Sequence, residues 1–125
     1  MKLLLDTHAL IWWLANNPTL SENARTAIAD PENLVFVSAV SAWEIAIKKS
    51  LGKLDVPGDL AQQITKHNFQ ALPISIKHGI AVGMLPWHHK DPFDRMLIAQ
   101  AIDESAIVIT RDRKFKLYDV SICEC

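Results

Sequence analysis

Cysteine is scarce in this sequence: two of its 125 residues are cysteines, Cys123 and Cys125, separated by a single residue. A disulfide at that spacing cannot staple a fold, and a structural zinc site requires four ligands. We therefore interpret the pair as thiols of a terminal strand, and we exclude a domain held together by disulfides or zinc.

A strong net charge and a long apolar run are also missing. The 13 lysines and arginines nearly balance 14 aspartates and glutamates, so any basic surface for a nucleic acid must be local. No apolar stretch is long enough to span a bilayer. The apolar beginning, MKLLLDTHALIWWLA, is interrupted by Asp6 and His8 and lacks a convincing small-residue cleavage site, so we expect a cytoplasmic protein with no membrane partner.

What is present is an alternation of short apolar runs with helix-like segments, over a length that suits one domain, residues 1–125. Strands are expected at residues 3–5, 34–38, 71–75, 106–110 and 119–123. Helices are expected at residues 7–14, 21–30, from 38 or 41 to about 52, 56–67, 76–84 and 92–103. Strands separated by helices predict an α/β fold of three layers, α/β/α, with a mostly parallel central sheet.

Acidic residues follow these expected strands, at the end of the sheet where such folds place their sites. Asp6 follows the first strand and Asp112 follows the fourth, while Glu44 and Asp94 lie on helices that adjoin strands.

Three of these acids have an ordinary structural explanation. Asp6 could be a helix N-cap, Asp112 a turn residue, and Glu44 part of a capping box with Ser41 or of an ion pair with Lys48.

The stretch HKDPFDRMLIAQA assigns different roles to its two aspartates. Pro92 is preset for the first position of a helix, which makes Asp91 the N-cap. Leu97 and Ile98 lie three and four residues beyond Asp94, so they share its helix face and direct its carboxylate toward the core. A buried carboxylate is costly unless it is paired, hydrogen-bonded or bound to a cation. Asp91 is therefore the expected cap and Asp94 the expected functional residue.

Convergence of four carboxylates would raise the pKa of each through mutual repulsion, and a divalent cation removes that penalty. Oxygen ligands without accompanying cysteine favour Mg²⁺ or Mn²⁺. Such a cation can deprotonate water, and a pair of cations can hold the attacking and leaving oxygens of a phosphodiester.

At these residues the sequence resembles a PIN-domain nuclease, specifically the VapC-type toxin of a VapBC toxin–antitoxin pair. The resemblance covers nearly the whole chain and is carried, in the family's order, by LLLDTHALIWWL, VSAVSAWEIAIKKSLGKL, HKDPFDRMLIAQA and IVITRDRKF. It implies a single PIN domain, a homodimer, and inhibition by an antitoxin whose segment enters the active-site groove.

The resemblance also implies the site and its chemistry. The acidic cluster falls on Asp6, Glu44, Asp94 and Asp112, with Asp6 and Asp94 as the main Mg²⁺ or Mn²⁺ ligands and Thr110 as a hydroxyl that orients a ligand or water. The implied activity is that of an endoribonuclease in which metal-activated water attacks an RNA phosphate.

Basic residues near these acids are candidate RNA contacts. Arg111, Arg113 and Lys114 surround Asp112 and form either a phosphate-binding patch or a solvated loop. Lys48 is either a surface ion pair or a cation near the metal site. Arg95 is expected either to contact RNA or to brace the groove.

Two alternatives to a ribonuclease stay open. The first alternative is a DNA-directed nuclease of the same fold, because hydrolysis by metal-activated water does not select between ribose and deoxyribose. The other is a non-catalytic module that binds a partner on a tryptophan-rich surface, drawn from Trp12, Trp13 and Trp87, with Trp43 expected in ordinary packing.

Overall fold

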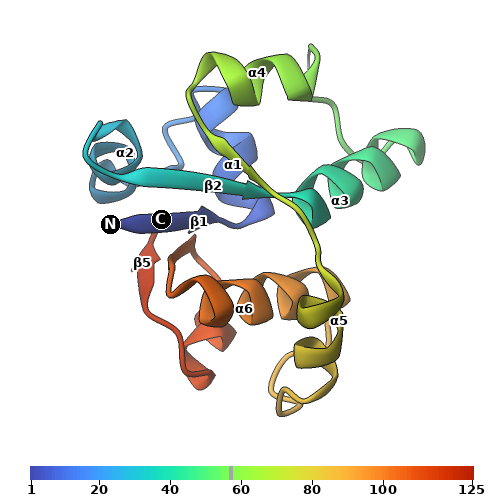
Figure 1. The fold of residues 1–125 in the computed structure, drawn as a ribbon. Helices are drawn as coiled ribbons and strands as arrows, with labels where there is room; N and C mark the ends of the chain where they lie inside the picture. Colours follow the sequence, from blue (N-terminus) through green and yellow to red (C-terminus); the bar gives the residue numbers. More distant parts are fainter. Residues whose placement is uncertain (57) are drawn as a thin grey trace.

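A five-stranded parallel sheet forms the centre of the protein, whose computed structural model describes residues 1–56 and 58–125 (Figure 1). The strands are β1 (Lys2–Leu5), β2 (Leu34–Ser38), β3 (Gln70–Leu72), β4 (Ile107–Thr110) and β5 (Ile122–Glu124). Their order in the sheet is β3-β2-β1-β4-β5, and all four neighbouring pairs are parallel. The expected parallel sheet is therefore confirmed.

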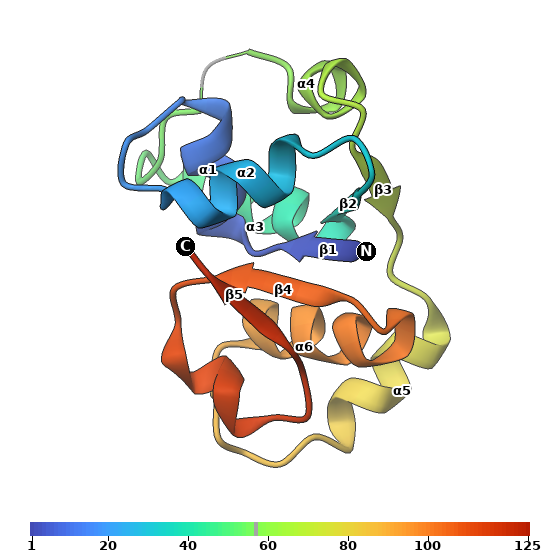
Figure 2. The ribbon, with the colours of Figure 1, turned by 90° about the vertical axis from the view of Figure 1, so that its left-hand side faces the viewer.

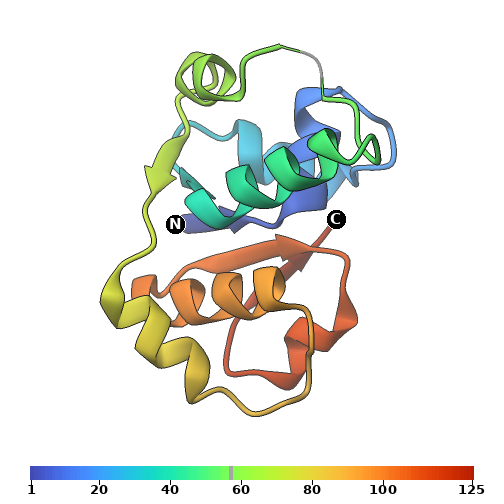
Figure 3. The same cartoon turned by 90° about the vertical axis from the view of Figure 1, so that its right-hand side faces the viewer.

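Helices cover both faces of this sheet. They are α1 (Thr7–Leu14), α2 (Glu22–Ala29), α3 (Ala39–Ser50), α4 (Leu60–Lys66), α5 (Ile76–Gly83), α6 (Pro92–Glu104) and the short 3₁₀ helix η1 (Arg113–Leu117). Figure 2 shows α1 and α2 on one side of the strands and α6 with η1 on the other. The opposite view places α3 and α4 with the first layer and α5 with the second (Figure 3). The fold is the predicted three-layer α/β/α arrangement.

The central strand β1 divides the core in two. Successive side chains of a strand point to opposite faces, so Leu3 and Leu5 pack into the cluster under α1 and α2, while Leu4 packs into the cluster under α6. All three leucines are at most 1% exposed. Burial on both faces explains why β1 is a continuous apolar run, as is typical of parallel sheets.

Some helix and strand boundaries differ from the sequence-based expectations. The helix α3 begins at Ala39 with Ser38 as its N-cap, so Ser41 lies inside the helix and the Ser41–Glu44 capping box is wrong. The helix α4 begins only at Leu60, after an Asp59 N-cap. Part of its expected start, Pro57, lies outside the described residues.

The segments after β3 and β4 also differ. The strand β3 ends at Leu72, before Pro73, and Ser75 caps α5, so the expected strand over residues 71–75 is largely wrong. The basic segment after β4 is not a loop but the helix η1, anchored by the completely buried Phe115. In the part of the chain that the structure describes, no helix has the length and apolar character needed to cross a membrane.

Candidate active site

Three neighbouring strands end at the same edge of the sheet, and each has a polar residue at its last position or directly after it. Because β2, β1 and β4 are parallel and adjacent, their carboxyl ends bring Ser38, Asp6 and Thr110 to one edge. The helices α1 and α3 begin at this edge, and α3 contacts α6. The structure therefore places Asp6 at the carboxyl edge of the sheet, near the starts of α1 and α3.

Asp6 uses its two carboxylate oxygens for two purposes. Its Oδ1 accepts a hydrogen bond from the backbone N–H of Ala9 at 2.8 Å, which caps α1. Its Oδ2 accepts one from the hydroxyl of Thr110 at 2.6 Å. Burial raises the pKa of Asp6, although these two hydrogen bonds oppose the shift. The capping and site interpretations are therefore compatible for this residue.

Glu44 lies on the buried face of α3, where both of its oxygens are bound by side chains. The hydroxyl of Thr7 donates to Oε1 at 2.7 Å, and Nζ of Lys48 donates to Oε2 at 2.6 Å. Glu44 is 4% exposed, whereas the Lys48 side chain is 40% exposed. Of the two interpretations of Lys48, the structure shows the ion pair. The hydrogen bond with Glu44 raises the pKa of Lys48, and the charges of Asp91 and Asp94 add to this shift.

Asp94, in the first turn of α6, is a second acid whose pKa is raised. The N-cap carboxylate of Asp91 accepts hydrogen bonds from the backbone N–H groups of Phe93 and Asp94, as expected for the start of α6. Burial raises the pKa of Asp94 to about 8, helped by repulsion from the carboxylates of Asp91, Asp6, Glu44 and Asp112 in that order. The four predicted acids therefore lie close enough to interact.

Thr110 connects two of these acids. Its hydroxyl donates to Asp6 and accepts a hydrogen bond from the backbone N–H of Asp112 at 3.0 Å. Asp112 in turn caps η1 through Oδ1, which accepts from the backbone N–H of Lys114 at 2.9 Å. The other carboxylate oxygen of Asp112, Oδ2, is close to His89.

His89 is a site residue that the sequence analysis did not single out. Its Nε2 lies 2.7 Å from Oδ2 of Asp112 and 3.2 Å from Oδ2 of Asp94, and the residue is 6% exposed. No spacing rule indicated it, because a histidine in a loop is usually a surface residue. The tertiary structure alone brings it between two acids.

Comparison with known proteins identifies the family. Residues 3–120 match the family model of the PIN domain. This chain belongs to the PIN domain family. It is 30% identical over 116 residues to Ribonuclease VapC22 of Mycobacterium tuberculosis, a match that covers 90% of this chain and 88% of the relative. The family resemblance drawn from the four sequence motifs is thereby confirmed.

Solved structures support the fold of this PIN domain. The DNA-bound VapBC of Salmonella typhimurium aligns with a TM-score of 0.72 and 20% identity, over 99% of this chain and 98% of the other. VapBC2 of Rickettsia felis, bound to a promoter DNA fragment, aligns with a TM-score of 0.70 and 18% identity over the same shares. Because the sequence identities are low, these two matches show that the fold is shared and nothing more.

The acids of this PIN domain fit a divalent cation. The raised pKa of Asp94 shows that the site disfavours one more negative charge, a penalty that a bound cation would remove. His89, Asp94 and Asp112 present potential ligand atoms that all lie within 4.8 Å of one another. Carboxylate oxygens are the main donors of the site, and such oxygens can bind a divalent cation.

The remaining basic residues near the acids differ in the contacts of their side chains. Arg113 and Lys114 are exposed in the first turn of η1, next to Asp112. The guanidinium of Arg111 donates to the backbone carbonyls of Thr19 and Cys125, so it anchors the chain end.

Arg95 requires a correction as a candidate RNA contact. It is 4% exposed, and its guanidinium donates to backbone carbonyls that include those of Pro86, His89 and Val82. A buried guanidinium that donates to several backbone carbonyls is not available to bind a phosphate. Of the two interpretations, the structure therefore supports Arg95 as a residue that braces the groove.

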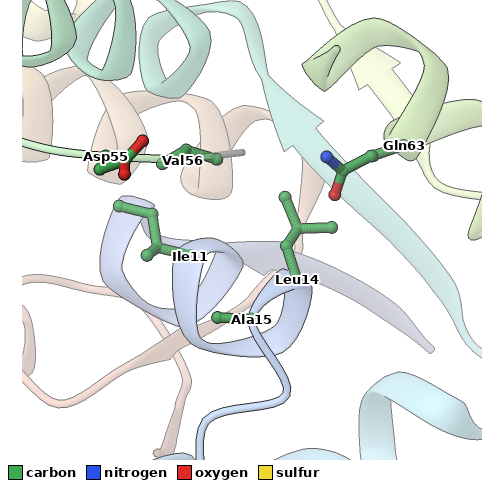
Figure 4. A pocket seen from close by; sticks show the side chains of 6 residues that line it. All are labelled: Ile11, Leu14, Ala15, Asp55, Val56 and Gln63. Carbon is green, nitrogen blue, oxygen red and sulfur yellow. The ribbon is translucent and has the colours of Figure 1, made fainter. Parts of the chain in front are cut away.

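An apolar pocket lies away from the acids, between α1 and the segment that leads into α4 (Figure 4). Figure 4 shows Ile11 of α1 beneath Asp55 and Val56, and Leu14 of α1 pointing toward Gln63. None of the four acids lines it, so it is not where phosphodiester chemistry would occur.

The tryptophans are distributed differently from the expectation. Trp43, expected in ordinary packing, is 59% exposed and meets Phe93 edge to face, with ring centroids 5.3 Å apart. Trp87 is exposed, whereas Trp12 and Trp13 are partly buried against the core.

Proposed function

We propose that this PIN domain is a metal-dependent endoribonuclease that acts as the toxin of a VapBC-type toxin–antitoxin pair. One observation carries the proposal: four acids from separate chain segments converge at the carboxyl edge of the sheet, and their repulsion contributes to the raised pKa of Asp94. The relative named Ribonuclease VapC22 and the solved VapBC complexes support this choice among the activities of the fold.

Asp6 and Asp94 would be the main ligands of Mg²⁺ or Mn²⁺, and Glu44 and Asp112 would complete the site directly or through water. When bound, the cation supplies a Lewis acid that lowers the pKa of water and stabilises charge on the phosphate. Thr110 contributes by fixing Oδ2 of Asp6.

The outer residues of the site have supporting tasks. Lys48 balances the charge of Glu44 at the exposed side. Arg113 and Lys114 provide cations for the flanking phosphates of the RNA. Hydrolysis by water leaves a 5′-phosphate and a 3′-hydroxyl and does not need the ribose 2′-hydroxyl, so selectivity for RNA depends on shape and contacts around the site.

Cleavage assays with the purified chain test this function. RNA and DNA are each incubated with Mg²⁺ or with EDTA, using wild type, Asp94→Asn and Asp91→Asn. We expect EDTA-sensitive cleavage of RNA that is lost in Asp94→Asn and largely retained in Asp91→Asn, since asparagine also serves as an N-cap. Preferential cleavage of DNA would favour the DNA-directed nuclease. Absence of cleavage in every condition would favour a binding module.

The proposed partners are a cognate antitoxin and a second copy of this chain, both acting with the toxin in the cytoplasm. One face of α5 and the following loop supports the homodimer: Ile76, Ile80, Met84 and Trp87 are 84%, 65%, 81% and 73% exposed. Burial of these exposed apolar side chains against a second copy would favour association.

Analytical ultracentrifugation tests the homodimer. We expect wild type to sediment as a dimer and Ile80→Glu as a monomer, because a buried unpaired charge would oppose association. Leu51→Glu, at the exposed C-cap of α3, is the matched control and should remain dimeric. A monomeric wild type would contradict the proposed dimer.

A further inference from the structure

The imidazole of His89 has a defined tautomer. The backbone N–H of Asp91 donates a hydrogen bond to its Nδ1 at 3.2 Å, so Nδ1 acts as an acceptor. In a neutral ring the proton is then on Nε2. That nitrogen is the one that faces the carboxylates of Asp94 and Asp112.

The Nε2–H group therefore lies between two acids. It is 2.7 Å from Oδ2 of Asp112 and 3.2 Å from Oδ2 of Asp94. A single donor shared by two carboxylate oxygens holds them at a fixed separation and reduces their repulsion. Because Nε2 carries the proton and Nδ1 is occupied, the ring in this arrangement has no lone pair to offer a metal ion.

The loop that carries His89 is held from two directions. The backbone N–H of His89 donates to the Tyr118 hydroxyl at 2.8 Å, and that hydroxyl donates to the carbonyl of Pro86 at 2.7 Å. Arg95 donates to the carbonyls of Pro86 and His89 at 3.0 and 3.2 Å, and its guanidinium lies 3.7 Å from the centroid of the Trp87 ring. The ring of His89 is therefore fixed before any ligand binds.

We propose that His89 is a positioning residue whose Nε2–H bridges Asp94 and Asp112 and sets the separation of these carboxylates for a divalent cation. The proposal rests on the proposed function, because the cation is the one that the nuclease site would hold. In this proposal Asp94 and Asp112 bind the cation directly, whereas His89 positions their carboxylates and does not bind the cation itself. Residues that orient metal ligands in this way commonly change metal affinity by about 10–100-fold when they are removed.

Mn²⁺ binding to the full chain without RNA, measured by calorimetry, tests the proposal directly. We expect His89→Ala to weaken Mn²⁺ binding by about 10–100-fold. His89→Gln should restore binding to within a few-fold of wild type, because its amide N–H can take the place of Nε2–H. His89→Asn, whose amide is too short to reach both acids, should resemble His89→Ala. His88→Ala, at the exposed neighbouring histidine, is the matched control and should bind as wild type does.

Two further measurements separate the alternatives. Pulsed EPR of bound Mn²⁺ should show no coupling to a coordinated imidazole nitrogen in wild type; such a coupling, lost in His89→Gln, would overturn the proposal in favour of direct ligation. Thermal unfolding without metal shows whether each variant is folded. The proposal would also be overturned by an unchanged Mn²⁺ affinity in a folded His89→Ala protein, or by a His89→Gln protein that binds Mn²⁺ no better than His89→Ala.

The same experiment distinguishes this proposal from the proposed function. Mn²⁺ binding that follows the expected order in a protein that cleaves no RNA would retain the role of His89 and reject the ribonuclease. A wild-type chain that binds no Mn²⁺ would reject both.

Discussion

Replacement of Asp94 by asparagine should stabilise the metal-free protein while it removes a carboxylate that the cation needs. Burial and neighbouring carboxylates raise the pKa of Asp94 from 3.8 to about 8. Between these two pH values the folded protein keeps a proton that the unfolded chain has released. The free energy of unfolding contributed by this group therefore falls as the pH rises toward 8.

The magnitude follows from the linkage between proton binding and folding. One pH unit in this range changes the free energy of unfolding by about 1.4 kcal/mol for a single proton. Between pH 5 and pH 7, wild type should therefore lose up to roughly 3 kcal/mol more stability than Asp94→Asn. The comparison with Asp94→Asn cancels the contributions of groups that titrate in both proteins.

Urea unfolding at pH 5, 6 and 7 in the presence of EDTA measures this difference. Asp59→Asn, at the exposed N-cap of α4, is the matched control and should follow the pH dependence of wild type. Saturating Mg²⁺ should reduce the difference, because a bound cation favours the ionised carboxylate. Parallel pH dependences for wild type and Asp94→Asn in EDTA would refute the reasoning.

Three further substitutions test the network around the acids. Thr110→Val removes the hydroxyl between Asp6 and Asp112, so we expect a loss of about 1–3 kcal/mol in the free energy of unfolding, together with reduced cleavage; an unchanged urea midpoint would contradict this. Arg95→Met leaves several backbone carbonyls without their donor and should lower stability by about 3 kcal/mol or more. If the protein still folds, the salt dependence of its RNA binding should match that of wild type, whereas a shallower dependence would restore Arg95 as a phosphate contact. Lys114→Ala should weaken RNA binding and reduce the slope of log K against log salt by about 1, as fluorescence anisotropy would detect; an unchanged slope would remove Lys114 from the binding surface.

Local signals explain why much of the fold was predictable from the sequence. Asp91 and Pro92 begin α6 as predicted, because an N-cap and a first-turn proline act within a few residues. The strand β2 occupies the predicted residues, since its β-branched run is a local pattern. The capping box at Ser41 was wrong because Ser38, three residues earlier, is itself a good cap and begins the helix first.

The roles of Arg95 and His89 could not be decided from the sequence, because they depend on contacts between distant parts of the chain. A charged residue next to Asp94 has the sequence pattern of a surface residue, and only the loop folded over α6 shows that the Arg95 side chain is buried. His89 lies 23 residues from Asp112 in the chain, so no periodicity connects them.

The sequence by itself determined which residue types are available and where the helices and strands lie, because hydrophobic periodicity and caps are short-range effects. It also supplied four acids in an order that resembles the PIN family. Only the tertiary structure decided which side chains share one environment, because contacts between strand ends and loops depend on the order of strands in the sheet. The tertiary structure buries Asp94 and so raises its pKa, buries Arg95 beneath the loop that precedes α6, and places Nε2 of His89 near the carboxylates of Asp94 and Asp112.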